Sequence, residues 1–253
     1  MPNFPSSHVS LVTGSSTGIG AAAALDLARA GSRVAVHYNS SEAAARTVVA
    51  QIEADGGTAW LYQGDLSTAE GARRLVSGVL TASGRIDCLV NNAGSLIERK
   101  LLLEVSDELW QQVMDVNLNS AFWVTKAVAA HMVERGSGSI INISSIAARN
   151  GGGPGAIPYA TAKAAMTCMT KGLAKELIAH GIRVNAVHPG VILTPFHERF
   201  TNPERMNAMV STIPQGRAGQ PDEIAGMITF LAGDRAGHIV GEAIEINGGM
   251  LMD

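Results

Sequence analysis

The chain contains few cysteines and few aromatic residues. Its 253 residues include 2 cysteines, and phenylalanine, tryptophan and tyrosine together make up 4%. Two cysteines are too few for a disulfide framework, and Cys88 and Cys168 belong to no CxxC motif or Cys/His cluster. We therefore interpret both as small core residues, and we expect no bound metal ion.

Long hydrophobic runs and clusters of one charge are also missing. Residues 1–8 contain no apolar segment of the kind found in signal peptides, and no apolar run is long enough to span a bilayer. The formal net charge is -3, with no basic run or face. These absences argue against a membrane or nucleic-acid partner, and we expect a cytoplasmic protein.

Small and branched apolar residues, by contrast, are abundant. Hydrophobic residues make up 46% of the chain and charged residues 16%. That composition supports one large core and gives no sign of disorder. Alanine, valine, isoleucine and glycine suit the close packing of helices on a sheet. Because there is no internal repeat or linker, residues 1–253 are predicted to form one α/β domain.

The N-terminal segment has the order strand, glycine-rich turn, helix. An apolar run at residues 9–13 leads into Gly14-Ser15-Ser16-Thr17-Gly18-Ile19-Gly20, and a strong helix former follows at residues 21–30. Glycines let the backbone approach a pyrophosphate, and a helix N-terminus offers unpaired N–H groups and the positive end of a dipole. This context predicts nucleotide binding, although the spacing is G-x-x-x-G-x-G and not the G-x-G-x-x-G of other dinucleotide folds.

The rest of the chain alternates between strand and helix patterns. Further strands are expected at residues 33–38, 58–63, 86–90, 138–145, 182–188 and 243–246. Helices are expected at residues 42–54, within 68–82, at 106–134, around Tyr159 and from residue 221. Such alternation predicts βαβ units. The fold class is therefore α/β, a Rossmann-type doubly wound parallel sheet of about seven strands with helices on both faces.

Ligands of such sheets bind beyond the carboxyl ends of the strands. Gly64-Asp65-Leu66 follows the third predicted strand, and Asn91-Asn92-Ala93-Gly94 follows the fourth. A nucleotide would lie along these segments, although the second one could also be an ordinary turn. After the second strand, Asn39-Ser40-Ser41-Glu42 resembles a capping box.

Two segments depart from this regular pattern. Asn117 lies inside a predicted helix, where asparagine competes for backbone hydrogen bonds. A bond to a neighbouring loop and a catalytic role are equally open for it. Residues 194–217 break the alternation and contain three prolines. A long irregular segment is often a lid, so we interpret it as a substrate loop.

Tyr159 and Lys163 stand four residues apart in a helical pattern and therefore share one helix face. A free phenol has a pKa of about 10, and a nearby ammonium favours the phenolate and lowers that pKa. Tyr159 is thus a candidate general acid or base, with Lys163 as its electrostatic partner. The alternative is an ordinary solvated helix face.

Together these motifs resemble those of the short-chain dehydrogenase/reductase family, in the same order and over nearly the whole chain. The matching pieces are Thr13-Gly14-x-x-x-Gly18-Ile19-Gly20, Asp65-Leu66, Asn91-Asn92-Ala93-Gly94, Asn117, Ser145, Tyr159-x-x-x-Lys163 and Pro189-Gly190. The size resembles the single-domain members. Sugar-nucleotide epimerases share Tyr-x-x-x-Lys but carry an extra substrate domain.

The resemblance implies a role for each motif. Tyr159 would donate a proton to a carbonyl oxygen, and Lys163 would bond the nicotinamide ribose and lower the Tyr159 pKa. Ser145 would bond the substrate oxygen, and Asn117 would hold a water in a proton relay. The remaining cofactor-binding residues implied are Gly14, Ser16, Thr17 and Ile19 at the pyrophosphate, Asp65 and Leu66 at the adenine, Asn91, Ala93 and Gly94 along the ribose, and Ile192 and Thr194, after Pro189 and Gly190, at the nicotinamide.

The sequence departs from the family pattern at two places. Ser145 precedes Tyr159 by fourteen residues, one more than in many relatives. Ser144 therefore remains a second candidate for the serine of the site. Thr17 stands where many NADP-dependent relatives carry a basic residue.

The resemblance implies an NAD(P)-dependent oxidoreductase that interconverts a ketone and a secondary alcohol by hydride transfer. Pro189-Gly190, Gly216-Arg217-Ala218-Gly219 and residues 241–249 look most like 3-oxoacyl-carrier-protein reductases, but dehydrogenases of sugars, polyols and steroids share these motifs. A nucleotide-binding regulator that has lost catalysis is the rival class, and its usual mark is a missing Tyr, Lys or Ser. A homotetramer is also implied.

The end of the second strand bears on the choice of cofactor. In dinucleotide folds an acidic side chain there bonds the ribose hydroxyls and repels a 2′-phosphate. Tyr38 and Asn39 occupy this place, and Ser40 and Ser41 follow with hydroxyl donors. NADP is therefore predicted over NAD. The preference should be modest, because no Arg or Lys stands beside these residues to form a charged fork.

Overall fold

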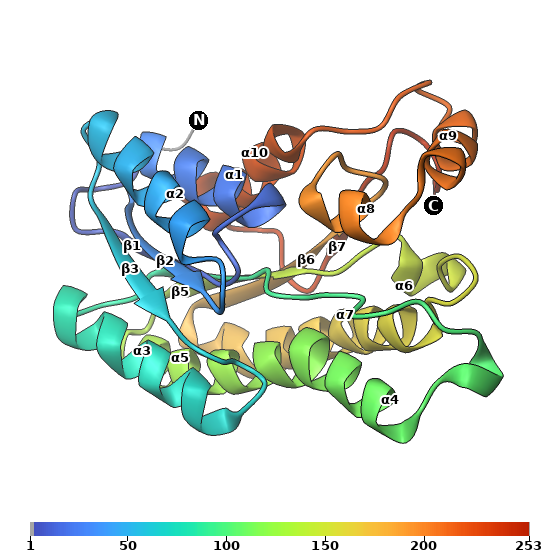
Figure 1. Cartoon of the computed structure of the whole chain (residues 1–253). Coiled ribbons are helices and arrows are strands. Elements are labelled where there is room, and N and C mark those ends of the chain that lie inside the picture. Colours follow the sequence, from blue (N-terminus) through green and yellow to red (C-terminus); the bar gives the residue numbers. More distant parts are fainter. Residues whose placement is uncertain (1–2, 253) are drawn as a thin grey trace.

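A parallel sheet of seven strands, in the order β3-β2-β1-β4-β5-β6-β7, forms the centre of the protein (Figure 1). The computed structural model describes residues 3–252. The strands are β1 (Val9–Val12), β2 (Arg33–Tyr38), β3 (Ala59–Gln63), β4 (Cys88–Asn91), β5 (Gly138–Ile143), β6 (Ile182–Pro189) and β7 (Ala243–Ile246). The predicted Rossmann-type sheet is confirmed.

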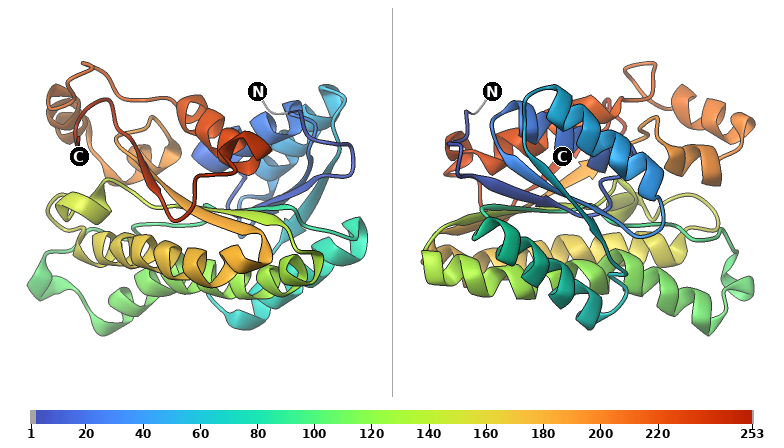
Figure 2. Two further views of the ribbon diagram at one scale, coloured as in Figure 1. Left: turned by 180° about the vertical axis from the view of Figure 1, so that it is seen from behind. Right: turned by 60° about the vertical axis from the view of Figure 1, so that its left-hand side comes forward.

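Helices cover both faces of the sheet (Figures 1 and 2). One face carries α1 (Gly18–Arg29), α2 (Glu42–Ala54) and α10 (Pro221–Ala232), and the other carries α3 (Ala69–Ser83), α4 (Asp107–Met114), α5 (Ser120–Arg135) and α7 (Ile157–Leu177). Three short helices are α6 (Ala147–Asn150), α8 (Pro195–Phe200) and α9 (Pro203–Ser211). In residues 3–252, no helix has both the length and the hydropathy to cross a bilayer.

Each face of the sheet has its own apolar core. Successive strand residues point to opposite faces. Ile141 accordingly packs in the cluster beneath α1, α2 and α10, whereas Ile140 packs in the cluster against α3, α5 and α7. Strands buried on both faces explain the nearly continuous apolar runs seen in the sequence.

Three local predictions are wrong. Asn39 does not cap α2, because Ser41 holds the N-cap position directly before Glu42 and makes no side-chain cap hydrogen bond. Cys168 is exposed, whereas Cys88 is buried. The buried face of α7 carries Met166 and Thr170, so Cys168, between them, points outward.

The third error concerns the long helix predicted at residues 106–134. It is two α-helices, α4 and α5, joined by a π-helical turn at Asp115–Asn119 that contains Asn117. Single π-helical turns inside α-helices are frequent at functional sites. The strand predicted at residues 138–145 also ends earlier, at Ile143, which places both serines in the connection that follows.

The strand order reverses between β1 and β4, and that reversal locates the site. In open α/β sheets, ligands bind beyond the carboxyl ends of the strands at such a switch point. The glycine-rich turn after β1, the segment after β4 and the serines after β5 all lie at this edge of the sheet. The three short helices α6, α8 and α9 lie near the same end (Figure 1).

Candidate active site

The turn after β1 is shaped by close approaches of the backbone. Gly14 has a φ of 61°, and a Cβ on it would lie 2.9 Å from the Cα of Ala93. A Cβ on Gly20 would lie 2.4 Å from Nδ2 of Asn92. Only glycine fits these two positions, because a side chain would separate the turn from the segment after β4.

Polar side chains from the neighbouring strands hold this turn in place. Asn92 Nδ2 donates to the carbonyl oxygens of Thr13 (3.0 Å) and Gly14 (2.9 Å). The Gly14 N–H donates to His37 Nδ1 (3.0 Å), so the His37 proton is on Nε2, which donates to the Gly64 carbonyl (3.0 Å). Burial lowers the pKa of His37 to about 4, which keeps the imidazole neutral at neutral pH. His37 thus ties the first turn to the end of β3.

The N-terminus of α1 has no side-chain cap. Thr17 is the N-cap residue but makes no side-chain cap hydrogen bond, and the first turn contains no acidic residue. In contrast, Thr68 caps α3 and Ser106 caps α4. Thr17 is exposed, and Ser16 and Ile19 are half-buried beside it. Uncapped N–H groups next to a glycine turn fit a pyrophosphate.

The residues predicted at the adenosine end divide into exposed and buried ones. Asn39, Ser40 and Asp65 are exposed. Leu66 is buried in the core, and Tyr38 is 8% exposed in the cluster beneath α1 and α2. The side chains available to a ribose at this edge are therefore those of Asn39 and Ser40, and not that of Tyr38.

The side chain of Asn91 is also buried and points into the protein interior. Its Nδ2 donates to Thr125 Oγ1 (2.8 Å) and to Asn142 Oδ1 (2.9 Å), both buried. The side chain therefore ties β4 to α5 and β5. The motif pattern pointed to Asn91 and missed the turn-holding contacts of Asn92 and His37. Their positions at strand ends were the only sequence signal.

The segment after β6 lies against the glycine turn. Pro189 ends β6, and Gly190 and a buried Ile192 follow it. Thr194 Oγ1 donates to the Ile192 carbonyl (3.3 Å). A Cβ on Gly18 would lie 3.2 Å from Cγ2 of Thr194. The structure thus brings these predicted residues next to the N-terminus of α1.

Tyr159 and Lys163 lie on the same face of α7, and Lys163 reaches the segment after β4. The Lys163 Nζ lies 5.6 Å from the centre of the Tyr159 ring and donates to the Ile143 carbonyl (2.7 Å). A Cβ on Gly94 would lie 2.7 Å from Asn117 Oδ1 and 3.2 Å from Lys163 Nζ. Gly94 thus allows the ammonium and the asparagine to approach each other.

The pKa values of this pair differ from the expectation. Burial raises the pKa of Tyr159 to about 12, while a hydrogen bond with Ser145 and the charge of Arg99 act in the opposite direction. Burial lowers the pKa of Lys163 to about 8. The predicted lowering of the Tyr159 pKa by Lys163 is not met in this structure, because desolvation dominates and the ammonium is directed at the Ile143 carbonyl.

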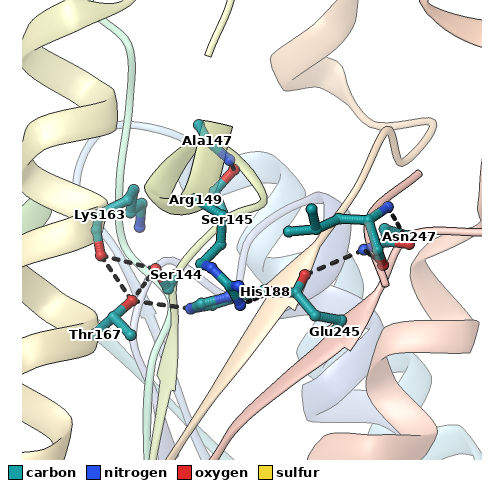
Figure 3. A network of polar contacts seen from close by, with 10 residues as sticks. Ser144, Ser145, Ala147, Arg149, Lys163, Thr167, His188, Glu245 and Asn247 are labelled. Atoms are coloured by element: carbon teal, nitrogen blue, oxygen red, sulfur yellow. Dashed lines mark hydrogen bonds and ion pairs between the residues drawn. The ribbon is translucent and has the colours of Figure 1, made fainter. Parts of the chain in front are cut away.

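The two serines after β5 have different surroundings (Figure 3). Ser144 is buried, and its Oγ donates to the Lys163 carbonyl (2.8 Å). Ser145 Oγ accepts from the Ala147 N–H (3.1 Å) and is hydrogen-bonded with Tyr159. Ser145 is therefore the serine next to the Tyr159 hydroxyl, whereas Ser144 bonds to the backbone of α7.

A chain of polar contacts continues from Ser144 across the sheet (Figure 3). Ser144 Oγ lies 3.0 Å from Thr167 Oγ1, which lies 2.9 Å from His188 Nε2. His188 Nδ1 donates to Glu245 (2.7 Å), and Asn247 donates to the same carboxylate (3.1 Å). These contacts connect β6 and β7 to the helix that carries Lys163.

Both amide N–H donors of the Asn117 side chain, and one acceptor site of its oxygen, are used by the protein. Its Nδ2 donates to the carbonyl oxygens of Ser95 (2.7 Å) and Val113 (2.8 Å), and its Oδ1 accepts from the Ser95 N–H (3.1 Å). The bond to a neighbouring loop, one of the two alternatives, is therefore present. A proton relay at this residue would have to use its backbone carbonyl or the remaining acceptor site of this oxygen.

Comparisons with known proteins agree with this geometry. The model of a family described as enoyl-(acyl carrier protein) reductase matches residues 14–251. A 3-oxoacyl-[acyl-carrier-protein] reductase of Synechocystis is 45% identical over 246 residues, 97% of each chain. One from Staphylococcus aureus is 38% identical over 242 residues, 96% of this chain and 97% of the relative. The chain belongs to the short-chain dehydrogenase/reductase family.

Solved structures of this family superpose closely on the protein. A short-chain type dehydrogenase/reductase from Mycobacterium marinum has a TM-score of 0.93 and 34% identity, and the match covers 97% of this chain and 96% of that one. A protein from Beutenbergia cavernae, with a TM-score of 0.90 and 34% identity over 96% of each chain, was solved with bound NADP. The protein is thus an enzyme of the short-chain dehydrogenase/reductase family, whose members use NAD(P).

Proposed function

We propose that this short-chain dehydrogenase/reductase interconverts a ketone and a secondary alcohol. The observation that carries the proposal is the convergence of Tyr159, Ser145 and Lys163 beside an uncapped helix N-terminus. The bound nicotinamide supplies or accepts the hydride. The glycine turn beside the uncapped N-terminus of α1 fits the pyrophosphate of a dinucleotide.

In the direction of reduction, Tyr159 acts as the proton donor. With a pKa of about 12 the phenol keeps its proton at neutral pH. An oxygen that gains negative charge as the carbonyl is reduced becomes a strong enough base to take this proton. Ser145 donates to the same oxygen and stabilises the developing charge. Lys163 binds the nicotinamide ribose, and in its protonated form it favours the phenolate left behind.

For the substrate we propose a 3-oxoacyl thioester, with sugar or polyol oxidation as the alternative. Two relatives named as 3-oxoacyl-[acyl-carrier-protein] reductases support this substrate. They match nearly all of the chain, at 45% and 38% identity. The test is a screen of 3-oxoacyl thioesters, ketones, sugars and polyols that follows the absorbance of the reduced nicotinamide. Turnover of polyols but no thioester would overturn this substrate, and no turnover at all would overturn the oxidoreductase activity.

For the cofactor we propose a modest preference for NADP over NAD. The exposed side chains after β2, Asn39 and Ser40, carry no charge that would repel a 2′-phosphate. A structural relative with bound NADP is consistent with this choice. No arginine or lysine of the second strand end forms a fork for the phosphate, so the preference stays small.

Four further predictions from the sequence stay proposals. Residues 194–217 are proposed as a substrate lid on one domain spanning residues 1–253, supported by the two short proline-started helices α8 and α9. Hydrogen exchange should fall there when cofactor and substrate bind, and equal exchange in both states would argue against a lid. A homotetramer is proposed from the family resemblance, and light scattering would measure the assembly. A cytoplasmic location stays a proposal from the sequence.

A further inference from the structure

Two arginines that are distant in sequence lie close together near Tyr159 and the proposed lid. Arg99 follows the segment after β4, and Arg205 belongs to α9. Arg99 Nη1 and Arg205 Nη2 both donate to the carbonyl oxygen of Pro154, at 3.4 and 3.1 Å. Arg99 Nε also donates to the Phe200 carbonyl (2.8 Å) at the end of α8. The two guanidinium groups therefore lie together between the loop at Pro154 and the proposed lid.

The arginine pair lies next to the catalytic tyrosine. The Tyr159 ring packs against Phe196, with ring centres 5.6 Å apart, and Phe196 packs against Phe200 at 5.1 Å. The carbonyl of Phe200 is the one that holds Arg99. The charge of Arg99 also acts to lower the pKa of Tyr159, although burial outweighs it. A substrate with its carbonyl at Tyr159 would therefore lie within the field of the pair.

The positive charge of this pair is not neutralised by the protein. Throughout residues 3–252, no carboxylate lies within ion-pair distance of either Arg99 or Arg205, and the nearby Glu98 pairs with Lys100. The Arg99 pKa is lowered by burial and then by the charge of Arg205. Two like charges held together at half-buried positions cost free energy. A bound anion would remove that cost.

Both side chains keep donors free for such an anion. A guanidinium has five N–H groups in a fixed fork. Arg99 uses its Nε and one Nη1 donor, and Arg205 uses one Nη2 donor, all to neutral carbonyl oxygens. The contacts at Pro154 are exposed to solvent. A carboxylate or phosphate is bound bidentately by groups of this kind.

The backbone before Arg99 is held in an unusual conformation. Ile97 has a φ of 61°, which is an outlier for a β-branched residue. Its N–H donates to Ser95 Oγ (3.0 Å), and Asn117 holds both the N–H and the carbonyl of Ser95. Strain of this kind persists where the surroundings fix it, and it clusters at ligand sites. Here it directs the chain from Asn117 toward Arg99.

We propose that Arg99 and Arg205 form a subsite for an anionic oxygen group of the substrate, a carboxylate or a phosphate. The proposal rests on the ketone–alcohol chemistry proposed above, since the anion belongs to the molecule that reacts at Tyr159. The anion has two possible sources. It is either a carboxylate on a small oxo or hydroxy acid, or a phosphate on the arm of a carrier-bound thioester.

The test compares matched substrates in the wild type and in Arg205→Gln. One arm pairs oxo acids with their methyl esters, for example acetoacetate with methyl acetoacetate. The other arm pairs acetoacetyl-CoA with the N-acetylcysteamine thioester of the same acyl group, which has no phosphate. We expect kcat/KM to favour the anionic member of one pair, and Arg205→Gln to reduce that ratio at least tenfold.

Two control variants separate the effect of the positive charge from that of a general structural change. Arg205→Lys keeps the charge and should restore part of the ratio, and Arg74→Gln on the exposed face of α3 should leave it unchanged. If the neutral members react equally well in the wild type, or if Arg205→Gln leaves both ratios unaltered, the subsite is wrong. The arm whose ratio falls identifies the source of the anion.

A binding measurement keeps this outcome distinct from failure of the proposed function. If no neutral or anionic compound is turned over, the proposed ketone–alcohol activity fails. The subsite is then decided by thermal unfolding with malonate or inorganic phosphate in the presence of NADPH. A saturable rise in Tm in the wild type that is lost in Arg205→Gln supports it. An equal rise, or no rise, in both proteins overturns it.

Discussion

The two halves of the candidate active site differ in how they are built. On the proposed cofactor side, glycines bring backbone segments together, and polar side chains such as those of His37 and Asn92 bond to the backbone of the turn. On the substrate side, long side chains form the surface, and Arg99 and Arg205 keep unpaired charges at half-buried positions. The backbone therefore shapes the first side, whereas side chains shape the second.

The two sides should therefore respond differently to substitutions. Where the backbone shapes the site, a substitution changes the local fold. Side chains can be exchanged without moving the strands that carry them. We therefore expect substitutions on the cofactor side to alter stability and cofactor use, and substitutions on the substrate side to alter which molecule reacts.

The largest effect should come from Tyr159→Phe, where the two sides meet. Removing the hydroxyl should lower kcat by about 10²- to 10⁴-fold, the usual contribution of a positioned proton donor. The ring and its packing against Phe196 remain, so the cofactor dissociation constant should change little. Tyr62→Phe is the control, because the Tyr62 hydroxyl donates to the Gly78 carbonyl on α3 (3.4 Å). Near-normal turnover by folded Tyr159→Phe would remove Tyr159 from its role.

His37→Gln tests the rigidity of the cofactor side through its dependence on pH. The folded protein holds the His37 pKa at about 4, against an ordinary histidine value of 6.5. The unfolded chain therefore binds the extra proton first, and stability falls as pH drops from 6.5 toward 4, by about 3 kcal/mol for this residue. Glutamine does not titrate, so urea unfolding should lose this part of the acid sensitivity.

The control for that experiment is His238→Gln, at an exposed position. It should reproduce the pH dependence of the wild type. If His37→Gln and the wild type lose stability in parallel between pH 6.5 and 4, the neutral imidazole does not hold Gly14 as described. Cofactor affinity measured at pH 7 provides a second readout, because the Gly14 contact shapes the turn.

Ser145→Ala and Ser144→Ala form a matched pair one residue apart. Ser145→Ala should reduce kcat by about 100-fold, as loss of one donor to a developing oxyanion does. Ser144→Ala should lower unfolding stability by about 1 kcal/mol through the lost bond to the Lys163 carbonyl, with a much smaller effect on kcat. Steady-state kinetics and urea unfolding of both variants measure this. The reverse pattern would make Ser144 the serine of the site.

The smallest effect is expected for Asn39→Asp, at the exposed end of β2. A carboxylate there should repel a 2′-phosphate and move the ratio of kcat/KM for NADP and NAD about tenfold toward NAD, or about 1.4 kcal/mol. Tyr38 is not suitable for this test, because a charge at that position would be buried. A wild type that prefers NAD, or an Asn39→Asp variant with unchanged preference, would contradict the assignment.

The fold was predictable because its signals are local. Apolar runs separated by helical patterns indicated the strand and helix order, and Gly14, Gly18 and Gly20 indicated the turn between β1 and α1. The sequence could not show that Tyr38 and the Asn91 side chain face the interior, because the alternation of a strand buried on both faces leaves no polar side to read. Asn117 was recognised as unusual, and its π-helical turn supplies the reason.

The substrate side was not predictable for a different reason. Arg99 and Arg205 come from segments far apart in the chain. The tertiary fold brings both to the carbonyl oxygen of Pro154. The Tyr159 pKa was misjudged because burial of a side chain cannot be read from its spacing to Lys163. Distances along a helix are fixed by sequence, but desolvation depends on everything that packs above it.

The left-handed Ile97 has a consequence for attempts to improve this enzyme. Asparagine tolerates that conformation better than isoleucine, so Ile97→Asn should relieve about 1–2 kcal/mol of backbone strain. A library selected only for heat resistance would enrich such changes. Ile97 lies two residues before Arg99, so the same change could alter the position of that arginine. A screen at Ile97 should therefore score heat resistance and substrate choice in every clone.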